Sequence, residues 1–468
     1  MSTVDRMTPL DAAFLQAEDS EEGVSLAISS VAVFGGPAPA QEEFTEMLTG
    51  RLPLVPRYRQ KVRMVPLDLG PPVWVDDPHF DLGHHVRRTA LPTPGGDTEL
   101  AALVGRVMSA RLDRGHPLWE YWVVEGLAGG RWALISKVHH CMVDGVSGTD
   151  LYHVVLDDSP EPRPSPPDAW HPAPEPTTVA LTASALLTLA MNPVTQMRAL
   201  TTALRHPRRL AGAARDALRG AAALSTALVP TRATSLSGPL SAQRVYAFSR
   251  GSVDDVRTVR HGAGGTFNDV VLAAVTSGFR TLLLARGEEP DVRAVRSLVP
   301  VNVRAPGQES IRDNRVSLML ADLPVEVADP LERLAAVRAR LDELKQDREA
   351  EAGVALTSIA ALEPFPLVAG SFRWLATLPQ RSVVTVTTNV PGPRKPLYAL
   401  GRPVVEIIPY VPIASTARIG VSIFSYLDRI AFGVTGDCDA APDVDVLARG
   451  IADGLAELVA ATTAGAHR

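Results

Sequence analysis

A dense run of prolines between residues 159 and 178 is the feature that most restricts how this chain can fold. Nearly every second or third residue of the run is proline, which lacks a backbone N–H and fixes φ. The run therefore forms neither a helix nor a central strand, and we expect an extended linker. The predicted division is a first lobe of residues 1–158, a connecting region of residues 159–235 and a second lobe of residues 236–468.

Length and composition favour two soluble lobes. A chain of 468 residues is too long for one ordinary core. Apolar residues make up 46% of the chain and charged residues 21%, the proportions of a soluble globular protein. The net charge of -6 argues against nucleic acid as the main partner, because phosphate binding requires a basic surface.

The sequence also indicates a compartment. Two cysteines, Cys141 and Cys438, are too few for a disulfide framework and favour a reducing environment. Residues 1–13 carry acids and no long apolar run, unlike a secretory signal. No stretch reaches the roughly 20 apolar residues that span a bilayer. We expect a cytoplasmic protein without a transmembrane helix.

The expected order of elements is α/β in both lobes. Hydrophobic periodicity and β-branched runs predict strands at residues 25–34, 121–125, 132–138, 297–303, 382–388, 418–425 and 429–434. Helices are expected at residues 97–112, 266–285, 330–348 and 444–461, and in the alanine- and leucine-rich, arginine-bearing residues 177–233, which Pro193 and Pro207 interrupt.

The richest group of reactive side chains follows the strand predicted at residues 132–138. His139 and His140 end this strand, and a short loop leads to Asp144 and Gly145, which turn the chain into a further helix. Successive strand residues point to opposite faces, so only one of the two histidines faces a given cleft. A neutral imidazole within hydrogen-bond reach of a hydroxyl can remove its proton as the oxygen attacks a carbonyl.

The residues alone leave other readings open. Both histidines can be structural loop residues, and Asp144 can cap the following helix or pair with an arginine. A zinc site is disfavoured, because the spacing lacks a C-x-x-C or H-E-x-x-H layout, and we expect no metal here. Cys141 beside a histidine suggests a covalent acyl-enzyme. Its side chain should point away from that of its neighbour, which argues against that reading.

The motif His139-His140-x-x-x-Asp144-Gly145 resembles the HHxxxDG motif of the chloramphenicol acetyltransferase/condensation-domain superfamily. Within that superfamily the chain closely resembles the bacterial wax ester synthase/diacylglycerol acyltransferase family. The supporting stretches keep their order along most of the chain: Pro9-Leu10-Asp11, Phe14-Leu15, Pro117-Leu118-Trp119-Glu120, Asn268-Asp269-Val270, Pro300-Val301-Asn302-Val303-Arg304, Asp313-Asn314-Arg315-Val316-Ser317 and Thr388-Asn389-Val390-Pro391-Gly392-Pro393.

The resemblance implies an α/β fold of two chloramphenicol-acetyltransferase-like lobes, each a mixed sheet with flanking helices, with the active site in a tunnel between them. It implies an acyl-CoA-dependent O-acyltransferase that makes triacylglycerol from diacylglycerol, with wax esters from long-chain alcohols as further products. Acyl transfer would be direct, without an acyl-enzyme. Acyl-CoA would be a substrate, and no cofactor is expected.

Roles of single residues also follow from the resemblance. His140 would be the general base and His139 would support it. Asp144 would be structural and paired with an arginine, for which Arg304 is our choice. The remaining residues would support the site or bind substrate: Gly145, Pro117, Leu118 and Trp119 in the cleft wall, and Asn268, Asp269 and Asn389. Asp269 also lies three residues after Thr266, so it can complete a capping box.

The lipid substrates require contact with a surface. We expect peripheral association with the inner face of the membrane or with lipid droplets, and the arginine-bearing residues 177–233 fit an interfacial helix. A second reading is that this segment only connects the lobes. Two other functions stay open: an acyltransferase of the same superfamily that acts on a polyketide or glycolipid hydroxyl, and a lipid-binding protein without activity.

Overall fold

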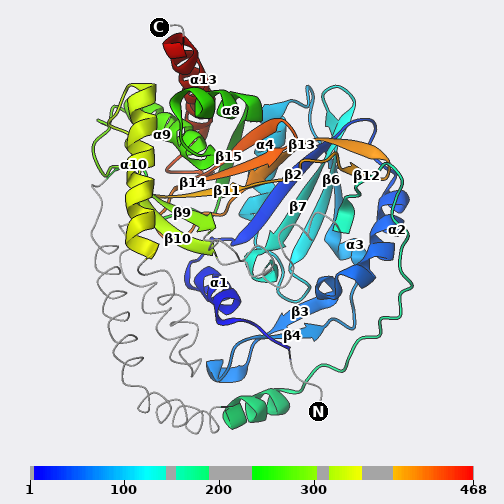
Figure 1. Cartoon of the computed structure of the whole chain (residues 1–468). Coiled ribbons are helices and arrows are strands. Elements are labelled where there is room, and N and C mark those ends of the chain that lie inside the picture. Colours follow the sequence, from blue (N-terminus) through cyan, green and yellow to red (C-terminus); the bar gives the residue numbers. More distant parts are fainter. Residues whose placement is uncertain (1–4, 144–153, 189–233, 303–315, 350–382, 467–468) are drawn as a thin grey trace.

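The computed structural model describes residues 5–143, 154–188, 234–302, 316–349 and 383–466. Two six-stranded sheets dominate it, each with helices packed against it (Figure 1). The first sheet has the strand order β12-β13-β2-β7-β6-β5 and the second has the order β10-β9-β11-β14-β15-β8. Both contain parallel and antiparallel neighbours, so the expectation of mixed sheets is confirmed.

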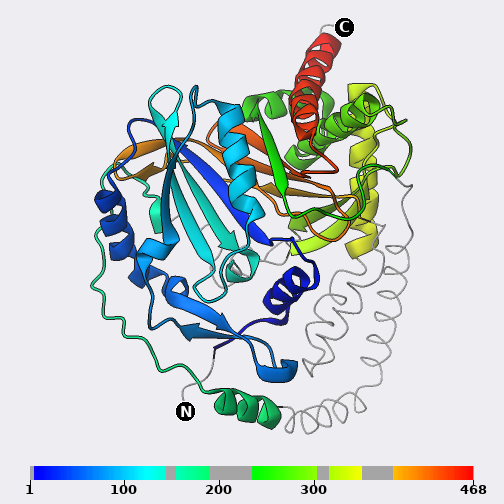
Figure 2. The same ribbon diagram turned by 180° about the vertical axis from the view of Figure 1, so that it is seen from behind.

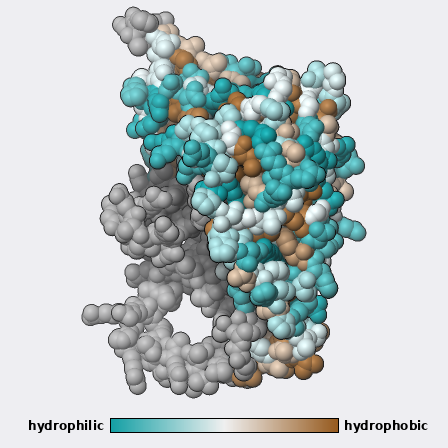
Figure 3. All heavy atoms as spheres, turned by 90° about the vertical axis from the view of Figure 1, so that its right-hand side faces the viewer, coloured by the Kyte–Doolittle hydropathy of each residue, from teal (hydrophilic) through white to brown (hydrophobic). Residues whose placement is uncertain are grey.

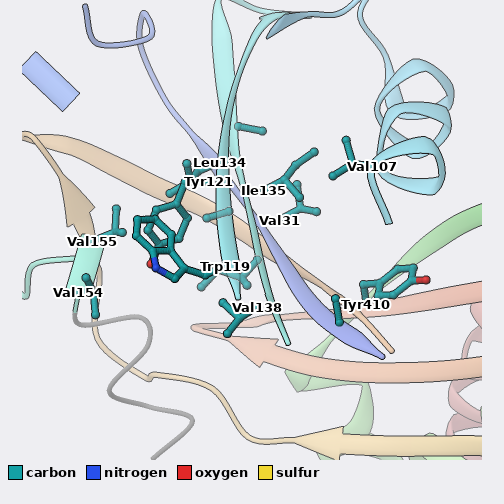
Figure 4. Close-up of a cluster of buried hydrophobic side chains, with 14 of the residues drawn as sticks. Val31, Val107, Trp119, Tyr121, Leu134, Ile135, Val138, Val154, Val155 and Tyr410 are labelled. Atoms are coloured by element: carbon teal, nitrogen blue, oxygen red, sulfur yellow. The ribbon is translucent and has the colours of Figure 1, made fainter. Parts of the chain in front are cut away.

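The first sheet and its helices come mostly from the chain before the linker. Its strands are β2 (Ala27–Phe34), β5 (Val86–Ala90), β6 (Trp119–Leu127), β7 (Arg131–His139), β12 (Tyr398–Ala399) and β13 (Arg402–Tyr410). The accompanying helices are α1 (Pro9–Ser20), α2 (Gln41–Arg51), α3 (Leu82–His85) and α4 (Asp97–Ser109). Apolar side chains cover both faces of this sheet: Val31 and Ile135 point toward Val107 of α4, whereas Trp119 lies on the other side with Val154 (Figure 4).

The second sheet is covered by long helices. Its strands are β8 (Arg244–Ser252), β9 (Arg296–Asn302), β10 (Val316–Asp322), β11 (Thr385–Val390), β14 (Ile419–Tyr426) and β15 (Arg429–Asp437). The helices are α8 (Val253–Ala263), α9 (Phe267–Ala285), α10 (Pro330–Glu349) and α13 (Val444–Ala466). Among the described residues α9 is long and apolar enough to cross a membrane, but 72% of its apolar window is buried. Its side chains form part of the second core, as expected of a core helix.

The elements expected from periodicity are present, with ends shifted by a few residues. The hairpin expected at residues 121–138 is the antiparallel pair β6 and β7, and the strand and helix expected at residues 25–34 and 97–112 are β2 and α4. The helix expected directly after Gly145 begins outside the described residues. Of the helical region expected at residues 177–233, the structure describes one helix, Thr178–Thr188.

The first sheet takes two strands from beyond the expected lobe boundary. β12 and β13 come from residues 236–468, yet β13 pairs with β2 of the first sheet. β13 also passes close to β15, where a Cβ at Gly433 would collide with the Pro409 carbonyl oxygen, so only glycine fits. On the other side of the molecule α4 packs beside β8, and the Arg244 N–H donates to Ser109 Oγ (2.8 Å; Figure 2). The first lobe is therefore not one continuous segment of the chain.

A small third sheet and the proline-rich segment lie together. β1 (Asp5–Arg6), β4 (Val73–Asp76) and β3 (Gln60–Arg63) form this sheet. Residues 159–177 contain neither helix nor strand, as their prolines predict. Asp168 of this segment pairs with the Arg59 guanidinium (Nη1–Oδ1 2.9 Å), and the ring of Trp170 lies under the same guanidinium. The segment is thus fixed to the first lobe.

Candidate active site

β7 carries the two histidines of the motif to the end of the first sheet. The His139 N–H donates to the Leu118 carbonyl oxygen (2.9 Å), and the His140 N–H donates to the Leu26 carbonyl oxygen (3.1 Å). The motif is therefore held by β6 on one side and by the start of β2 on the other. His139 is 1% exposed and His140 is partly exposed, as alternation along a strand requires.

Both ring nitrogens of His139 are engaged. The Cys141 N–H donates to His139 Nδ1 (3.2 Å), which therefore carries no proton. Nε2 then carries the proton and lies 3.1 Å from Glu18 Oε2. A neutral imidazole that accepts at one nitrogen and donates at the other has no nitrogen left for a substrate. His139 is a fixed support and not a free base.

Glu18 connects three parts of the site. It lies on α1, is 2% exposed, and its Oε2 accepts hydrogen bonds from both His139 and the Leu26 N–H (2.8 Å). Burial by itself raises its pKa, but the hydrogen bond and the electrostatic interaction with His139, the Leu26 N–H and the charge of Arg114 outweigh burial and lower the pKa to about 2. Glu18 is therefore ionised at neutral pH, and it fixes α1 to the ends of β2 and β7.

The ring of His140 is oriented by stacking. Phe14, one turn before Glu18 on α1, lies with its ring centroid 3.9 Å from that of His140 and an interplanar angle of 24°. The stacking restricts the plane in which the imidazole can present its nitrogens. The same helix therefore holds His139 through Glu18 and orients His140 through Phe14.

Sequence reasoning did not assign a role to Phe14 or Glu18. The signal was present, because residues four apart lie on one face of a helix and Phe14 belonged to a recognised stretch. The sequence did not show which residues pack against this face of α1, because the two histidines lie more than 120 residues away along the chain.

Cys141 lies beside His139 with its Sγ 3.0 Å from Nδ1. Together with Glu18 this resembles the order of a nucleophile, a base and an orienting acid. However, Cys141 is 1% exposed, and burial raises the pKa of its thiol far above the usual range. The thiol is thus a buried, protonated packing group.

If acyl transfer is direct, as the resemblance implies, Cys141→Ala should keep most of its activity, because direct transfer needs no thiolate. An acyl-enzyme mechanism instead requires complete loss of activity in this variant. Steady-state rates, together with a mass spectrum of the enzyme quenched during turnover, distinguish the two. Cys438, the other cysteine of the chain, serves as the matched control through Cys438→Ala.

Pro117, Leu118 and Trp119 lie in the core rather than at an open surface. All three are buried, and the Trp119 ring stacks between those of His85 and Tyr58 with centroid distances of 4.3 and 4.6 Å. The indole N–H donates to the Tyr58 carbonyl oxygen (2.9 Å). These residues support the site through the Leu118 carbonyl, which holds the backbone of His139.

Two predicted residues of the second lobe meet. Asn389 on β11 donates an N–H of its side-chain amide to the Asn268 side-chain oxygen at the start of α9 (3.1 Å). Next to Asn268, Asp269 completes a capping box: its Oδ2 accepts the Thr266 N–H (2.7 Å), and its own N–H donates to Thr266 Oγ1 (3.2 Å). Asp269 is 2% exposed, so its structural role is evident. Asp144, Gly145 and Arg304, and with them the expected ion pair, lie outside the described residues.

Comparison with known proteins places this geometry in a family. The model of the wax ester synthase/diacylglycerol acyltransferase catalytic domain matches residues 7–271, and that of the WS/DGAT C-terminal domain matches residues 313–459. A putative diacylglycerol O-acyltransferase of Mycobacterium bovis is 44% identical over 458 residues, which cover 98% of this chain and 96% of the relative. A probable diacylglycerol O-acyltransferase of Mycobacterium tuberculosis H37Rv has the same identity and coverage.

Solved structures of similar fold support the same family assignment. The wax ester synthase/diacylglycerol acyltransferase of Marinobacter aquaeolei VT8 is 26% identical with a TM-score of 0.67, covering 98% of this chain and all of that one. The first condensation domain of the CDA synthetase, 14% identical with a TM-score of 0.57, covers 98% of this chain and 97% of that one and shows the shared fold. The expected two-lobed fold is thereby confirmed. With both domain models matched and relatives aligned over nearly its full length, this chain belongs to the wax ester synthase/diacylglycerol acyltransferase family.

Proposed function

We propose that this acyltransferase moves a fatty acyl group from coenzyme A directly to the hydroxyl of diacylglycerol, with long-chain alcohols as further acceptors and His140 as the general base. The observation that carries the proposal is the unequal state of the two histidines. His139 is buried with both nitrogens engaged, whereas His140 is partly exposed and oriented by Phe14. Acyl-CoA enters as a substrate, and we propose no cofactor.

In the proposed reaction the His140 imidazole acts first as a base and then as an acid. His140 removes the proton of the acceptor hydroxyl as the oxygen attacks the thioester carbonyl carbon. The resulting tetrahedral oxyanion collapses, the carbon–sulfur bond breaks, and the imidazolium returns the proton to the leaving CoA thiolate. A hydrogen-bond donor at the oxyanion typically contributes about 3 kcal/mol. Asn389 is our candidate for this donor, because Asn268 holds its amide in place.

The test uses the purified full-length chain with palmitoyl-CoA. Diolein and hexadecanol are offered in separate reactions and together, and esters are separated by thin-layer chromatography while free thiol reports release of CoA. Formation of triacylglycerol with an equal amount of thiol supports the proposal. Hydrolysis alone, or transfer only to a hydroxylated polyketide or glycolipid offered in parallel, contradicts the lipid acceptor.

We propose that the enzyme reaches its lipid acceptor at the inner face of the membrane or at a lipid droplet. Exposed apolar side chains support this: Leu67 is 89% exposed in the loop between β3 and β4, and Leu186 and Leu187 on the helix Thr178–Thr188 are 51% and 59% exposed. The helix is fixed to β1 by Arg6, which donates to Ser184 Oγ (2.9 Å). Hydrophobic residues gather at the lower end of the view in Figure 3, the end at which Figure 1 places this helix.

The helix Thr178–Thr188 is connected to the site through β1, because β1 leads directly into α1. The arginines of residues 189–233 on which the sequence prediction relied lie outside the described residues. Within the described residues, the exposed apolar side chains are the features that favour membrane contact. Exposed apolar side chains that gather at one end of a molecule mark interaction sites.

A cosedimentation experiment tests the surface. We expect the double variant Leu67→Asp with Leu187→Asp to lose most of its binding to liposomes containing diolein. Leu284→Asp on α9, a residue 52% exposed in the other lobe, is the matched control and should bind as the original chain does. Equal binding by all three proteins contradicts this docking surface.

A further inference from the structure

A second group of reactive side chains lies in the first lobe, next to Trp119 and its neighbours. His84 of α3 and the turn Asp113–His116 between α4 and β6 bring together two imidazoles and a carboxylate. One ligand atom from each of His84, Asp113 and His116 lies within 4.8 Å of the others. The two histidine rings stack with centroids 3.8 Å apart. We propose that these three residues bind one divalent transition-metal ion of the zinc type.

The types of ligand fit such an ion. Imidazole nitrogen and carboxylate oxygen bind Zn²⁺ at about 2.0–2.2 Å, and tetrahedral geometry places ligand atoms about 3.4 Å apart. The ligand atoms therefore have to approach one another by up to about 1.4 Å, and the two imidazoles have to turn out of the ring stack. The His116 side chain is 34% exposed and that of Asp113 is 63% exposed, so both have room to move.

The orientation of Asp113 is already set by its turn. Its Oδ1 accepts the Gly115 N–H (2.8 Å), and the His116 N–H donates to the Asp113 carbonyl oxygen (3.2 Å). The other oxygen, Oδ2, lies 3.9 Å from His116 Nε2. The turn thus presents one carboxylate oxygen and one imidazole nitrogen on the same side, toward His84.

The buried carboxylate of Asp77 is a separate observation that favours a metal ion bound by His116. Asp77 is 2% exposed, and its Oδ1 accepts the His79 N–H (3.2 Å). Its Oδ2 is buried with no hydrogen-bond partner in the described part of the chain, and lies 3.9 Å from His116 Nδ1. A histidine that binds a metal through one nitrogen usually donates its other N–H to a carboxylate, which fixes the ring. Asp77 stands where that partner of His116 is needed.

The ion would brace the active site and take no part in the reaction. Arg114 lies within the same turn, and its guanidinium contacts Glu18 (3.5 Å) and donates to Asp19 (2.8 Å) of α1. His85, next to His84, donates a hydrogen bond from Nδ1 to the Trp119 carbonyl oxygen (2.8 Å). A metal joining α3 to this turn would therefore hold the segment that supports His139.

Metal titration tests the site. Tag-free full-length chain, stripped with chelator, is titrated with Zn²⁺ by calorimetry and with Co²⁺ by visible absorption. We expect one saturable equivalent, the absorption bands of Co²⁺ bound by nitrogen and oxygen, and a rise of Tm on addition of Zn²⁺. His84→Ala and His116→Ala should abolish the uptake, and Asp77→Asn should weaken it by about 10- to 100-fold.

Two further variants serve as controls for misfolding and for binding at other histidines. Asp113→Asn keeps the oxygen that caps its turn, so loss of metal uptake in this variant does not arise from misfolding. His261→Ala removes an exposed histidine of α8 and should titrate as the original chain does. No saturable uptake by the original chain, or uptake that persists in His84→Ala and His116→Ala, overturns the proposal.

Discussion

Replacing His140 by alanine is expected to lower kcat/KM by about 10²- to 10⁴-fold, the usual contribution of a positioned general base. The loss follows because His139 has both nitrogens engaged and cannot take over the proton. The variant should fold normally, since His140 is partly exposed and its backbone hydrogen bond to Leu26 is kept. Initial rates with palmitoyl-CoA and diolein measure the effect, and thermal unfolding checks the fold.

A comparison within the motif sharpens this expectation. His139→Ala leaves the buried Glu18 carboxylate without one partner, so it should lose stability as well as activity. His261→Ala, at an exposed position of α8, should change neither quantity and is the control. Full activity in His140→Ala would contradict the assignment of the base and would favour a different catalytic group.

Removing Glu18 should have the largest effect on stability. Glu18→Ala breaks a buried ion and hydrogen-bond network that joins α1, β2 and β7, and the loss of one partner of a buried pair costs about 3–5 kcal/mol. Activity should fall as well, because α1 also carries Phe14, which stacks on His140. Urea unfolding and kcat give the two readings.

Glu18→Gln separates charge from geometry. A glutamine oxygen can still accept the hydrogen bonds of His139 and the Leu26 N–H, so this variant should lose only the contribution of the charge. The pKa of Glu18 is lowered from 4.5 to about 2 on folding. A depressed pKa stabilises the fold above the unfolded value, and that contribution is lost as pH falls toward the folded value.

The original chain should therefore unfold with a higher free energy than Glu18→Gln at pH 6, where the carboxylate is ionised. This difference should shrink as pH falls from about 4.5 to about 2. Denaturant unfolding of both proteins at a series of pH values measures it. A difference that stays constant or grows in acid would show that the charge of Glu18 does not stabilise the fold.

Much of the fold could be predicted because local rules decide it. The prolines of residues 159–176 exclude regular structure wherever they lie, and the alternation of β7 places His139 and His140 on opposite sides of the strand. Thr266 and Asp269 are close enough in sequence to form their capping box without help from the rest of the chain. Each of these features depends on residues within one turn or one strand.

The rest depends on contacts between distant segments, which spacing along the chain does not encode. β13 joins the first sheet from the far side of the linker, Asn389 meets Asn268, and Glu18 reaches His139 across 121 positions. The sequence by itself therefore determined the family, the elements and the pair of histidines. Only the tertiary structure decided which histidine is buried against Glu18 and which is partly exposed and stacked on Phe14, because that depends on the helix α1 that packs against the motif.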